Sequence, residues 1–204
     1  MMKILIARTR EDIELAYEKF ANAAEIGCDT ETSSLSARNG RLFSVQFSDG
    51  EFNVLVPLSE RIQLGKLVEI LENEQITKIF HNARFDLAFL QENGFQVANV
   101  FCTMLAEKVL TKGAYQSASL AETLYRYFAV DLDKAPRDKF SSRKWDGVWT
   151  EELVSYALSD VVHLPQLMQE QNAWLLKLGL EKKYAEQIDK LLNLPSLKEG
   201  SSRF

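Results

Sequence analysis

The chain has 204 residues, of which 46% are hydrophobic and 26% charged, which is enough apolar material for one core of ordinary size. No run of about 18 apolar residues is present, which excludes a membrane-spanning helix, and the apolar stretch near the N-terminus is too short for a signal peptide. The net charge of −5 argues against a protein that coats long nucleic acids by electrostatic attraction, although it does not exclude an enzyme that acts on nucleic acids.

The chain contains two cysteines, Cys28 and Cys102, with no CxxC spacing. They would pair only if the fold brought them together, and the simpler interpretation is two buried, reduced thiols. Reduced thiols are typical of a cytoplasmic protein, and we therefore expect a cytoplasmic location.

The N-terminal segment is expected to form a strand followed by a helix. Residues 3–8 have the composition of a short strand. Thr9 is a suitable N-cap for a helix that continues to about residue 23. Glu11 and Asp12 then lie in its first turn, where acidic side chains interact favourably with the helix dipole.

A hairpin is the clearest local prediction. Residues 42–47 and 52–56 have the composition of strands and flank Asp49-Gly50, a dipeptide typical of a type I′ turn. Pro57 ends the second strand. The other strands expected in this half are residues 24–31, followed by a polar loop over 32–40, and residues 76–81 and 97–103.

Apolar residues at helical spacing predict a helix over 61–72 and another over 83–93, which ends at Gly94. From residue 103 onward the chain is expected to be mainly helical, over about 103–112, 118–128, 150–171 and 181–193. The basic stretch 131–147 has the composition of a loop.

These elements predict an α/β fold, in which a mixed sheet is flanked by helices and the C-terminal part is helical. We find no internal repeat and no linker that would divide the chain. The prediction is a single domain over residues 1–195, followed by a loose tail over 196–204.

The first candidate site is Asp29-Thr30-Glu31, at the end of a short apolar strand. Because side chains alternate along a strand, Asp29 and Glu31 point to the same face. An Asp-x-Glu pair alone is weak, since about one is expected by chance in this composition. Asp12-Ile13-Glu14 is such a chance match, with acids that suit a helix N-terminus. Two adjacent carboxylates on a strand repel each other unless metal or solvent compensates them.

Two further acids occupy comparable positions. Asp86 follows the predicted strand 76–81 and falls in the first turn of the next helix, where it either binds metal or stabilises the helix dipole. Tyr156 and Asp160 are four residues apart on a predicted helix and therefore share a face. Tyr127 and Asp131 have the same spacing, but Asp131 lies where its helix is expected to stop.

The strings Cys28-Asp29-Thr30-Glu31-Thr32, His81-Asn82-Ala83-Arg84-Phe85-Asp86 and Tyr156-x-x-x-Asp160 resemble the three motifs of the DEDDy exonucleases. That family has the ribonuclease H-like fold and includes ribonuclease D and the proofreading domain of family A DNA polymerases. The resemblance extends over about residues 20–170. It is closest to the nano-RNase C type, which degrades very short RNAs, whereas proofreading domains usually have Asp in place of Cys102.

The resemblance implies a 3′→5′ exonuclease that releases nucleoside 5′-monophosphates and depends on two divalent metal ions, Mg²⁺ or Mn²⁺. Asp29, Glu31, Asp86 and Asp160 would be the metal ligands, in keeping with the preference of hard cations for carboxylate oxygen. Tyr156 would orient the attacking water, because a phenol is mostly protonated at pH 7.

Further residues near these motifs are candidates for substrate binding. By resemblance, Leu35 and Phe85 would contact the terminal base, and Thr30 and Asn82 lie within the motifs themselves. Each remaining candidate has a functional and a structural interpretation. His81 would either contact the terminal nucleotide or pack under the next helix, and Trp145 would either stack on a base or anchor its loop. His163 would either approach the site or be a solvated helix residue, and the basic residues of 134–144 would either bind phosphates or serve solubility.

The predicted partner is single-stranded nucleic acid, in particular short RNA, and no membrane. Alternatives are a DNA exonuclease, a ribonuclease D-like RNA processor and, in a different class, an inactive nuclease fold that only binds nucleic acid. A homo-oligomer is expected from the resemblance alone.

Overall fold

The computed structural model describes residues 3–112, 114–132, 145 and 147–193. Its centre is a six-stranded mixed sheet in the order β1-β4-β3-β2-β5-β6. Only β3 runs antiparallel to its neighbours β2 and β4, while β1–β4, β2–β5 and β5–β6 pair in parallel. The strands are β1 (Lys3–Ile6), β2 (Glu25–Thr32), β3 (Leu42–Ser48), β4 (Phe52–Val56), β5 (Thr77–Phe80) and β6 (Val100–Cys102).

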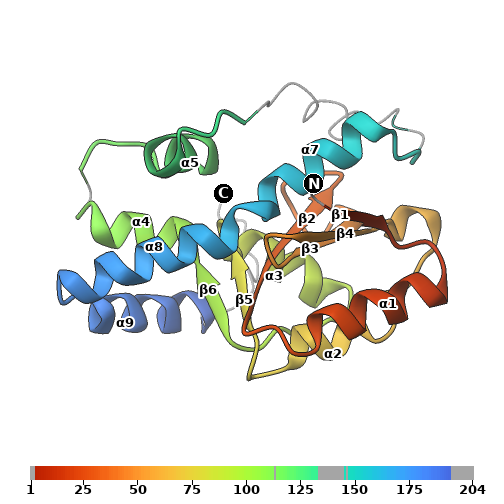
Figure 1. Ribbon diagram of the computed structural model, residues 1–204, viewed down its shortest axis with the longest axis horizontal. Coiled ribbons are helices and arrows are strands. Elements are labelled where there is room, and N and C mark those ends of the chain that lie inside the picture. The colour runs from red at the N-terminus through yellow and green to blue at the C-terminus, as the bar shows by residue number, and fades with distance from the viewer. Residues whose placement is uncertain (1–2, 113, 133–144, 146, 194–204) are drawn as a thin grey trace, which may run out of the picture.

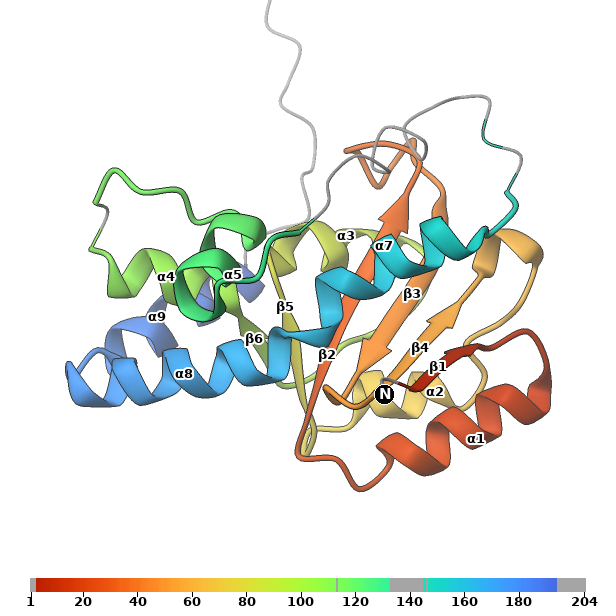
Figure 2. The same ribbon diagram turned by 45° about the horizontal axis from the view of Figure 1, so that its top comes forward.

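Helices cover both faces of this sheet (Figures 1 and 2). One face packs against α1 (Arg10–Phe20), α2 (Leu67–Glu72) and α3 (Ala83–Glu92) through a core that includes Phe20, Phe47 and Phe80. The other face packs against α7 (Glu151–Val162) and α8 (Leu164–Lys177) through a second core around Phe43, Ile79 and Val161. The remaining C-terminal helices are α4 (Thr103–Leu110) and α9 (Glu181–Leu192), which pack against α8, and α5 (Leu120–Phe128). The predicted mixed sheet with flanking helices is confirmed.

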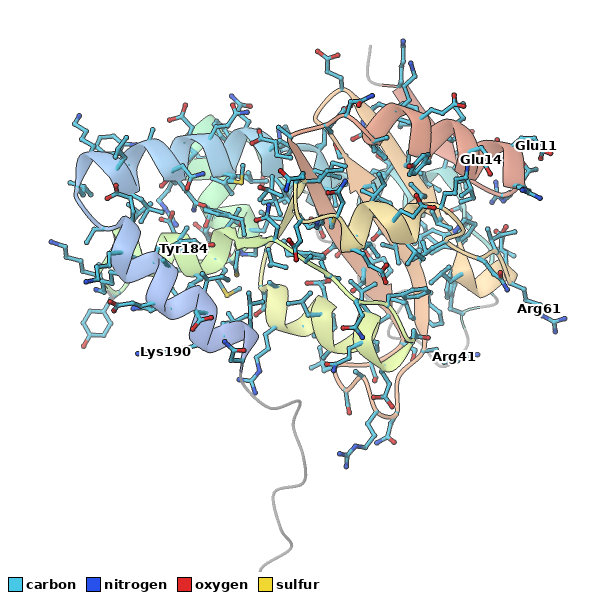
Figure 3. The ribbon with its side chains drawn as sticks, turned by 90° about the horizontal axis from the view of Figure 1, so that it is seen from below. Glu11, Glu14, Arg41, Arg61, Tyr184 and Lys190 are labelled. Atoms are coloured by element: carbon cyan, nitrogen blue, oxygen red, sulfur yellow. The ribbon has the colours of Figure 1, made fainter. Side chains whose placement is uncertain are left out.

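Hydrogen bonds fix helices near the two edge strands of the sheet, β1 and β6. Thr9 caps α1, and its hydroxyl accepts from the Asp12 amide while the Asp12 carboxylate accepts from the Thr9 amide. At the other end, the hydroxyl of Tyr184 on α9 accepts from the Cys102 amide at 2.8 Å, and its ring lies 4.8 Å from that of Phe101 (Figure 3). Asp12, the first acid of the chance match Asp12-Ile13-Glu14, therefore serves to cap α1.

The hairpin is confirmed, but the type I′ turn is wrong. The loop has three residues, 49–51, and only Gly50 among them has positive φ, at +95°. A type I′ turn needs positive φ at both central residues. The Asp49 carboxylate instead accepts from the amides of Glu51 and Phe52, which closes the wider loop.

Two helix predictions are also wrong. The helix expected over 61–72 begins only at Leu67, because Arg61 and Gly65 both have positive φ and a short 3-10 turn, Leu58–Glu60, precedes them. The helix expected over 150–171 is two helices that meet at His163, since Pro165 lacks an amide proton and lies in the first turn of α8.

Strand 97–103 is also shorter than predicted, as β6 covers only three residues. None of the helices within the described ranges is long and apolar enough to cross a lipid bilayer. The predicted tail and most of the basic stretch 131–147 lie outside the described residues.

Candidate active site

Three carboxylates from two elements meet above β2. Asp29 and Glu31 alternate with Thr30 along the strand and share the face on which α7 packs, and α7 supplies Asp160. One carboxylate oxygen of each of the three residues lies within 4.8 Å of the others. The strand alternation expected for Asp29 and Glu31 is therefore present, and the packing of α7 on β2 brings Asp160 beside them.

Asp86 reaches the same cavity from α3, where it lies in the first turn and is only 2% exposed. The hydroxyl of Thr30 donates to Asp86 Oδ1 at 2.7 Å. This proton is the only one that the hydroxyl can donate, so the Thr30 side chain is committed to orienting Asp86. Asn82, which precedes α3, has φ +66°, a conformation that asparagine tolerates better than most residues.

Burial raises the pKa of Asp29 well above its usual range, and the nearby charges of Asp86, Asp160 and Glu31 raise it further. Burial also raises the pKa of Asp86 to about 7, although the hydrogen bond from Thr30 opposes this rise. The protein therefore places carboxylates where their charged forms are unfavourable unless a cation joins them. An all-carboxylate donor set of this kind fits a hard divalent cation.

These residues line one cavity of about 430 Å³. Its wall contains all five residues predicted to be catalytic, namely Asp29, Glu31, Asp86, Tyr156 and Asp160. Of the residues predicted to bind substrate, it contains Thr30, Leu35, His81, Asn82 and Phe85. Leu35 is 83% exposed, so its apolar side chain is accessible to a ligand in the cavity.

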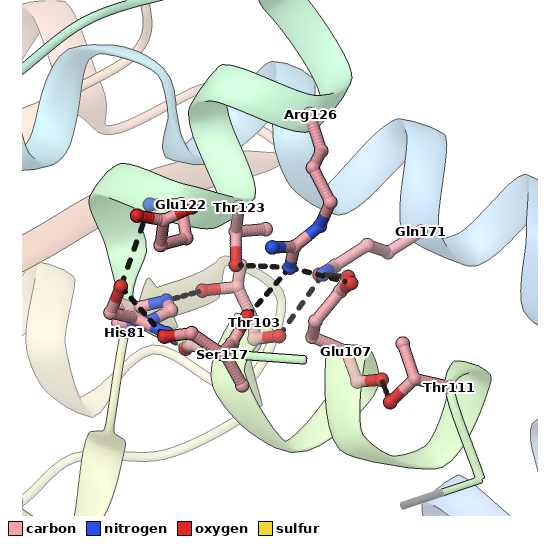
Figure 4. Close-up of polar contacts among 11 residues, drawn as sticks. His81, Thr103, Glu107, Thr111, Ser117, Glu122, Thr123, Arg126 and Gln171 are labelled. Atoms are coloured by element: carbon pink, nitrogen blue, oxygen red, sulfur yellow. Dashed lines mark hydrogen bonds and ion pairs between the residues drawn. The ribbon is translucent and has the colours of Figure 1, made fainter. Parts of the chain in front are cut away.

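His81 lines the cavity, but both of its ring nitrogens are already engaged (Figure 4). Nδ1 lies 2.8 Å from Thr103 Oγ1 and Nε2 lies 2.9 Å from the Ala118 carbonyl oxygen. Burial lowers the pKa of His81 to about 4, so the ring is neutral at pH 7. A neutral ring must donate from Nε2 to the carbonyl and accept the hydroxyl proton of Thr103 at Nδ1.

Trp145 is not brought to the cavity. Its ring packs against Phe43 and Trp149 with centroid distances of 4.5 Å and 5.3 Å, and its indole N–H donates to the Val148 carbonyl. These contacts favour the anchoring alternative for Trp145. His163 is half-buried at the junction of α7 and α8 and is not among the residues that line the cavity. Residues 134–144 lie outside the described residues.

The structure adds Thr32, which lies in the first motif but was not named as a site residue, and cavity residues outside the motifs, namely Ser33, Ser34, Met104, Ser119, Leu120, Ala121 and Leu132. Gln46 does not line the cavity, but it pairs directly opposite Asp29 on β3 and is fully buried, with no hydrogen-bond partner for Oε1 among the described residues. No motif marks the segment around Ser119, which only the fold brings near β2.

A family model described as a 3′-5′ exonuclease matches residues 4–173. Ribonuclease D of Bartonella henselae is 29% identical over 184 residues, which cover 89% of this chain and 42% of that protein. The chain thus spans less than half the length of this relative.

Two solved structures of Brucella melitensis NrnC are similar over nearly their whole length. The structure with bound Mg²⁺ has a TM-score of 0.75 and 27% identity, with 93% of this chain and 90% of that chain covered. The structure bound to pGG has a TM-score of 0.76 and 28% identity, with 94% and 90% covered.

The raised pKa of Asp86 predicts how metal and pH affect stability. Its folded-state pKa of about 7 exceeds the ordinary value of 3.8, so the metal-free folded state binds the extra proton and loses stability as pH rises through about 7. In EDTA, the melting temperature of Asp86→Asn relative to wild type should therefore increase from pH 5 to pH 7.5, by several degrees. Mg²⁺ should raise the wild-type value most at pH 7.5. A difference that stays constant with pH would contradict this assignment.

The hydrogen bond between Thr30 and Asp86 predicts a role for a single hydroxyl. Loss of a partner that orients a ligand typically weakens metal binding by about 10-fold to 100-fold. Thr30→Val should therefore weaken Mn²⁺ binding, measured by electron paramagnetic resonance, by about 10-fold. Thr30→Ser keeps the hydroxyl and should bind nearly as well as wild type. Equal weakening in both variants would show that the methyl group, and not the hydrogen bond, matters.

Proposed function

Because this chain belongs to the 3′-5′ exonuclease family, of the DEDDy type with the ribonuclease H-like fold, we propose that it removes nucleotides one at a time from the 3′ end of single-stranded RNA. The products would be nucleoside 5′-monophosphates, and short RNAs would be the preferred substrates. The observation that carries this proposal is the convergence of Asp29, Glu31 and Asp160 within 4.8 Å, in a cavity that also contains Asp86 and Tyr156.

The family is dependent on divalent metal ions, and the finer proposal is that this site holds two. Asp29, Glu31 and Asp160 would hold one ion, and Asp29 and Asp86 the other, with Mg²⁺ or Mn²⁺ as the species. When bound, such ions make a water nucleophilic near neutral pH and neutralise the leaving oxygen of a phosphodiester. The raised pKa values of Asp29 and Asp86 support this proposal, because a cation would relieve the repulsion that contributes to the rise at Asp29.

Other side chains of the cavity would position the water, the metal ligands and the substrate. Tyr156 lies one turn before Asp160 on α7 and would orient the attacking water through its hydroxyl. Thr30 holds Asp86 in place. Leu35 and Phe85 would contact the terminal base from the rim, where an apolar side chain can stack against any base without selecting its sequence.

Two features support short substrates. The cavity of about 430 Å³ lies at the lower end of the size range of small-molecule sites, which suits the end of a chain more than a long strand. The net charge of −5 gives little general attraction for long polyanions. One similar structure, that of NrnC, was solved with pGG, which suggests a comparable ligand here.

The substrate proposal predicts the outcome of a time course with 5′-labelled RNAs of 2, 5 and 20 nucleotides and matching DNAs. In Mg²⁺ we expect rapid loss of the 2-nucleotide RNA and slow trimming of the 20-nucleotide RNA. Asp29→Asn removes a ligand charge with little change in volume and should lower the rate at least about 100-fold, since it removes charge stabilisation in the transition state.

The other outcomes distinguish the alternatives. Even laddering of the 20-nucleotide RNA would favour a ribonuclease D-like processor. Faster cleavage of the DNAs than of the RNAs would favour a DNA exonuclease. Cleavage in EDTA, or equal rates for wild type and Asp29→Asn, would contradict metal-dependent catalysis at this site. Binding without any cleavage would leave a nucleic-acid-binding module.

A homo-oligomer and a cytoplasmic location are also part of this proposal. Apolar side chains are exposed at the end of α8, with Trp174, Leu176 and Leu178 at 43%, 68% and 51% exposure, and a second copy would cover such a surface. A single monomeric mass in multi-angle light scattering would contradict assembly. Cys28 and Cys102 are both buried and not bonded to each other, in keeping with a reducing compartment.

A further inference from the structure

One wall of the catalytic cavity comes from the connection between α4 and α5 and the first turn of α5. Ser119, Leu120 and Ala121 line the cavity opposite the acidic residues. The connection that leads to them is exposed at residues 114–117, and α5 itself buries only Thr123 and Leu124. Packing alone therefore holds this wall weakly, and its position depends on polar contacts.

Arg126 on α5 makes the first of these contacts. Its Nη2 atom donates to the carbonyl oxygen of Ser117 at 2.8 Å and to Glu107 Oε1 at 3.0 Å (Figure 4). Since Nη2 carries two protons, these two short bonds use both, and the 3.4 Å contact with Thr123 is secondary. Arg126 thus ties the connection to an acid on α4.

Glu107 is in turn fixed from the other side. Its side chain is 4% exposed, and Oε2 accepts from Gln171 Nε2 on α8 at 3.1 Å. Gln171 is fully buried and also donates to the Thr103 carbonyl oxygen at 3.0 Å. The ion pair is therefore braced against α8, which packs on the central strand β2.

His81 makes the second contact, one residue further along. Its Nε2 donates to the Ala118 carbonyl oxygen, while its Nδ1 accepts from Thr103 at the start of α4. Consecutive carbonyls, of Ser117 and Ala118, are thus each held by a side chain anchored on α4. The two carbonyls belong to the residues immediately before Ser119. Ser119 is the N-cap of α5, and its hydroxyl accepts from the Glu122 amide.

Only the Glu107 side of this ion pair is buried, at 4% exposure against 28% for Arg126. If the pair served only stability, apolar residues of similar volume would often hold two helices as well or better. Here the arginine does not end on the acid but continues to a backbone carbonyl of the cavity wall. That second bond is what an apolar pair would lack.

We infer that Glu107 and Arg126 are positioning residues, which hold the 117–121 wall in the conformation that receives the substrate. The inference rests on the proposed function. Without the ion pair, the wall would have to be ordered when the nucleotide binds, and that ordering would weaken binding without changing the acids that carry out the chemistry.

The test is the kinetics of Arg126→Met on a 5-nucleotide RNA, together with the Kd of the same fluorescein-labelled RNA in EDTA by anisotropy. Ordering of a loop and its side chains on binding predicts that KM and Kd rise about 5-fold to 10-fold, with kcat within about twofold of wild type. Arg10→Met is the matched control, because Arg10 is 87% exposed in an ion pair on α1, away from the cavity, and it should leave KM and Kd unchanged.

A second variant separates positioning from stability. Arg126→Met leaves Glu107 charged and buried, which lowers the melting temperature, and the double variant Glu107→Gln/Arg126→Met should recover that temperature while KM and Kd stay raised. Recovery of KM and Kd along with the melting temperature, or an Arg126→Met variant that behaves like Arg10→Met, would overturn the inference. A wild type that binds the RNA without cleaving it would overturn the proposed activity alone, and one that does not bind it would overturn both.

Discussion

Gly27 in β2 lies directly beneath the junction of α7 and α8. A Cβ atom at this position would lie 2.6 Å from the Val161 carbonyl oxygen and 3.1 Å from the Leu164 side chain, so the two helices can approach the strand only because the residue is glycine. Val161 directly follows Asp160, and Gly27 lies two residues before Asp29. This contact between backbone atoms therefore sets the height of α7 above the sheet and brings Asp160 beside Asp29.

The site is completed from the other face of the sheet. α3 begins at the carboxyl end of β5, and Asn82 in its left-handed conformation turns the chain so that Asp86 meets Thr30. Four carboxylates are thus brought together by elements that contact them from both sides of β2. Such a cluster lowers the stability of the folded state at neutral pH, and the two well-packed cores offset this loss. Functional sites commonly contain groups that destabilise the fold locally in this way.

The acidic cluster was predictable from sequence because the positions of its residues depend on short periodicities, period two for Asp29 and Glu31 and one helical turn for Tyr156 and Asp160. The hairpin was predictable from Asp49-Gly50, although the turn type was not, because the Asp49 side chain closes a longer loop. The helix break at His163 follows from Pro165, a signal that our prediction did not use.

What the sequence could not indicate are contacts between distant segments. His81 was expected either to touch substrate or to pack under a helix; it lines the cavity and also bonds Ala118, 37 residues away, a contact that no local pattern indicates. Glu107, Arg126 and Gln171 belong to three helices, and no spacing within one helix relates them. Trp145 was a candidate for base stacking, yet its ring lies with Phe43 and Trp149 outside the cavity. Such residues are assigned only once the packing of the helices is known.

The most direct test of the central claim, that these carboxylates form a centre for divalent metal ions, is anomalous diffraction from crystals grown with Mn²⁺ and a nucleoside 5′-monophosphate. We predict one manganese peak among Asp29, Glu31 and Asp160 and a second between Asp29 and Asp86, both absent in Asp29→Asn. Crystals that bind the nucleotide but show no anomalous peak at these four carboxylates would contradict the claim.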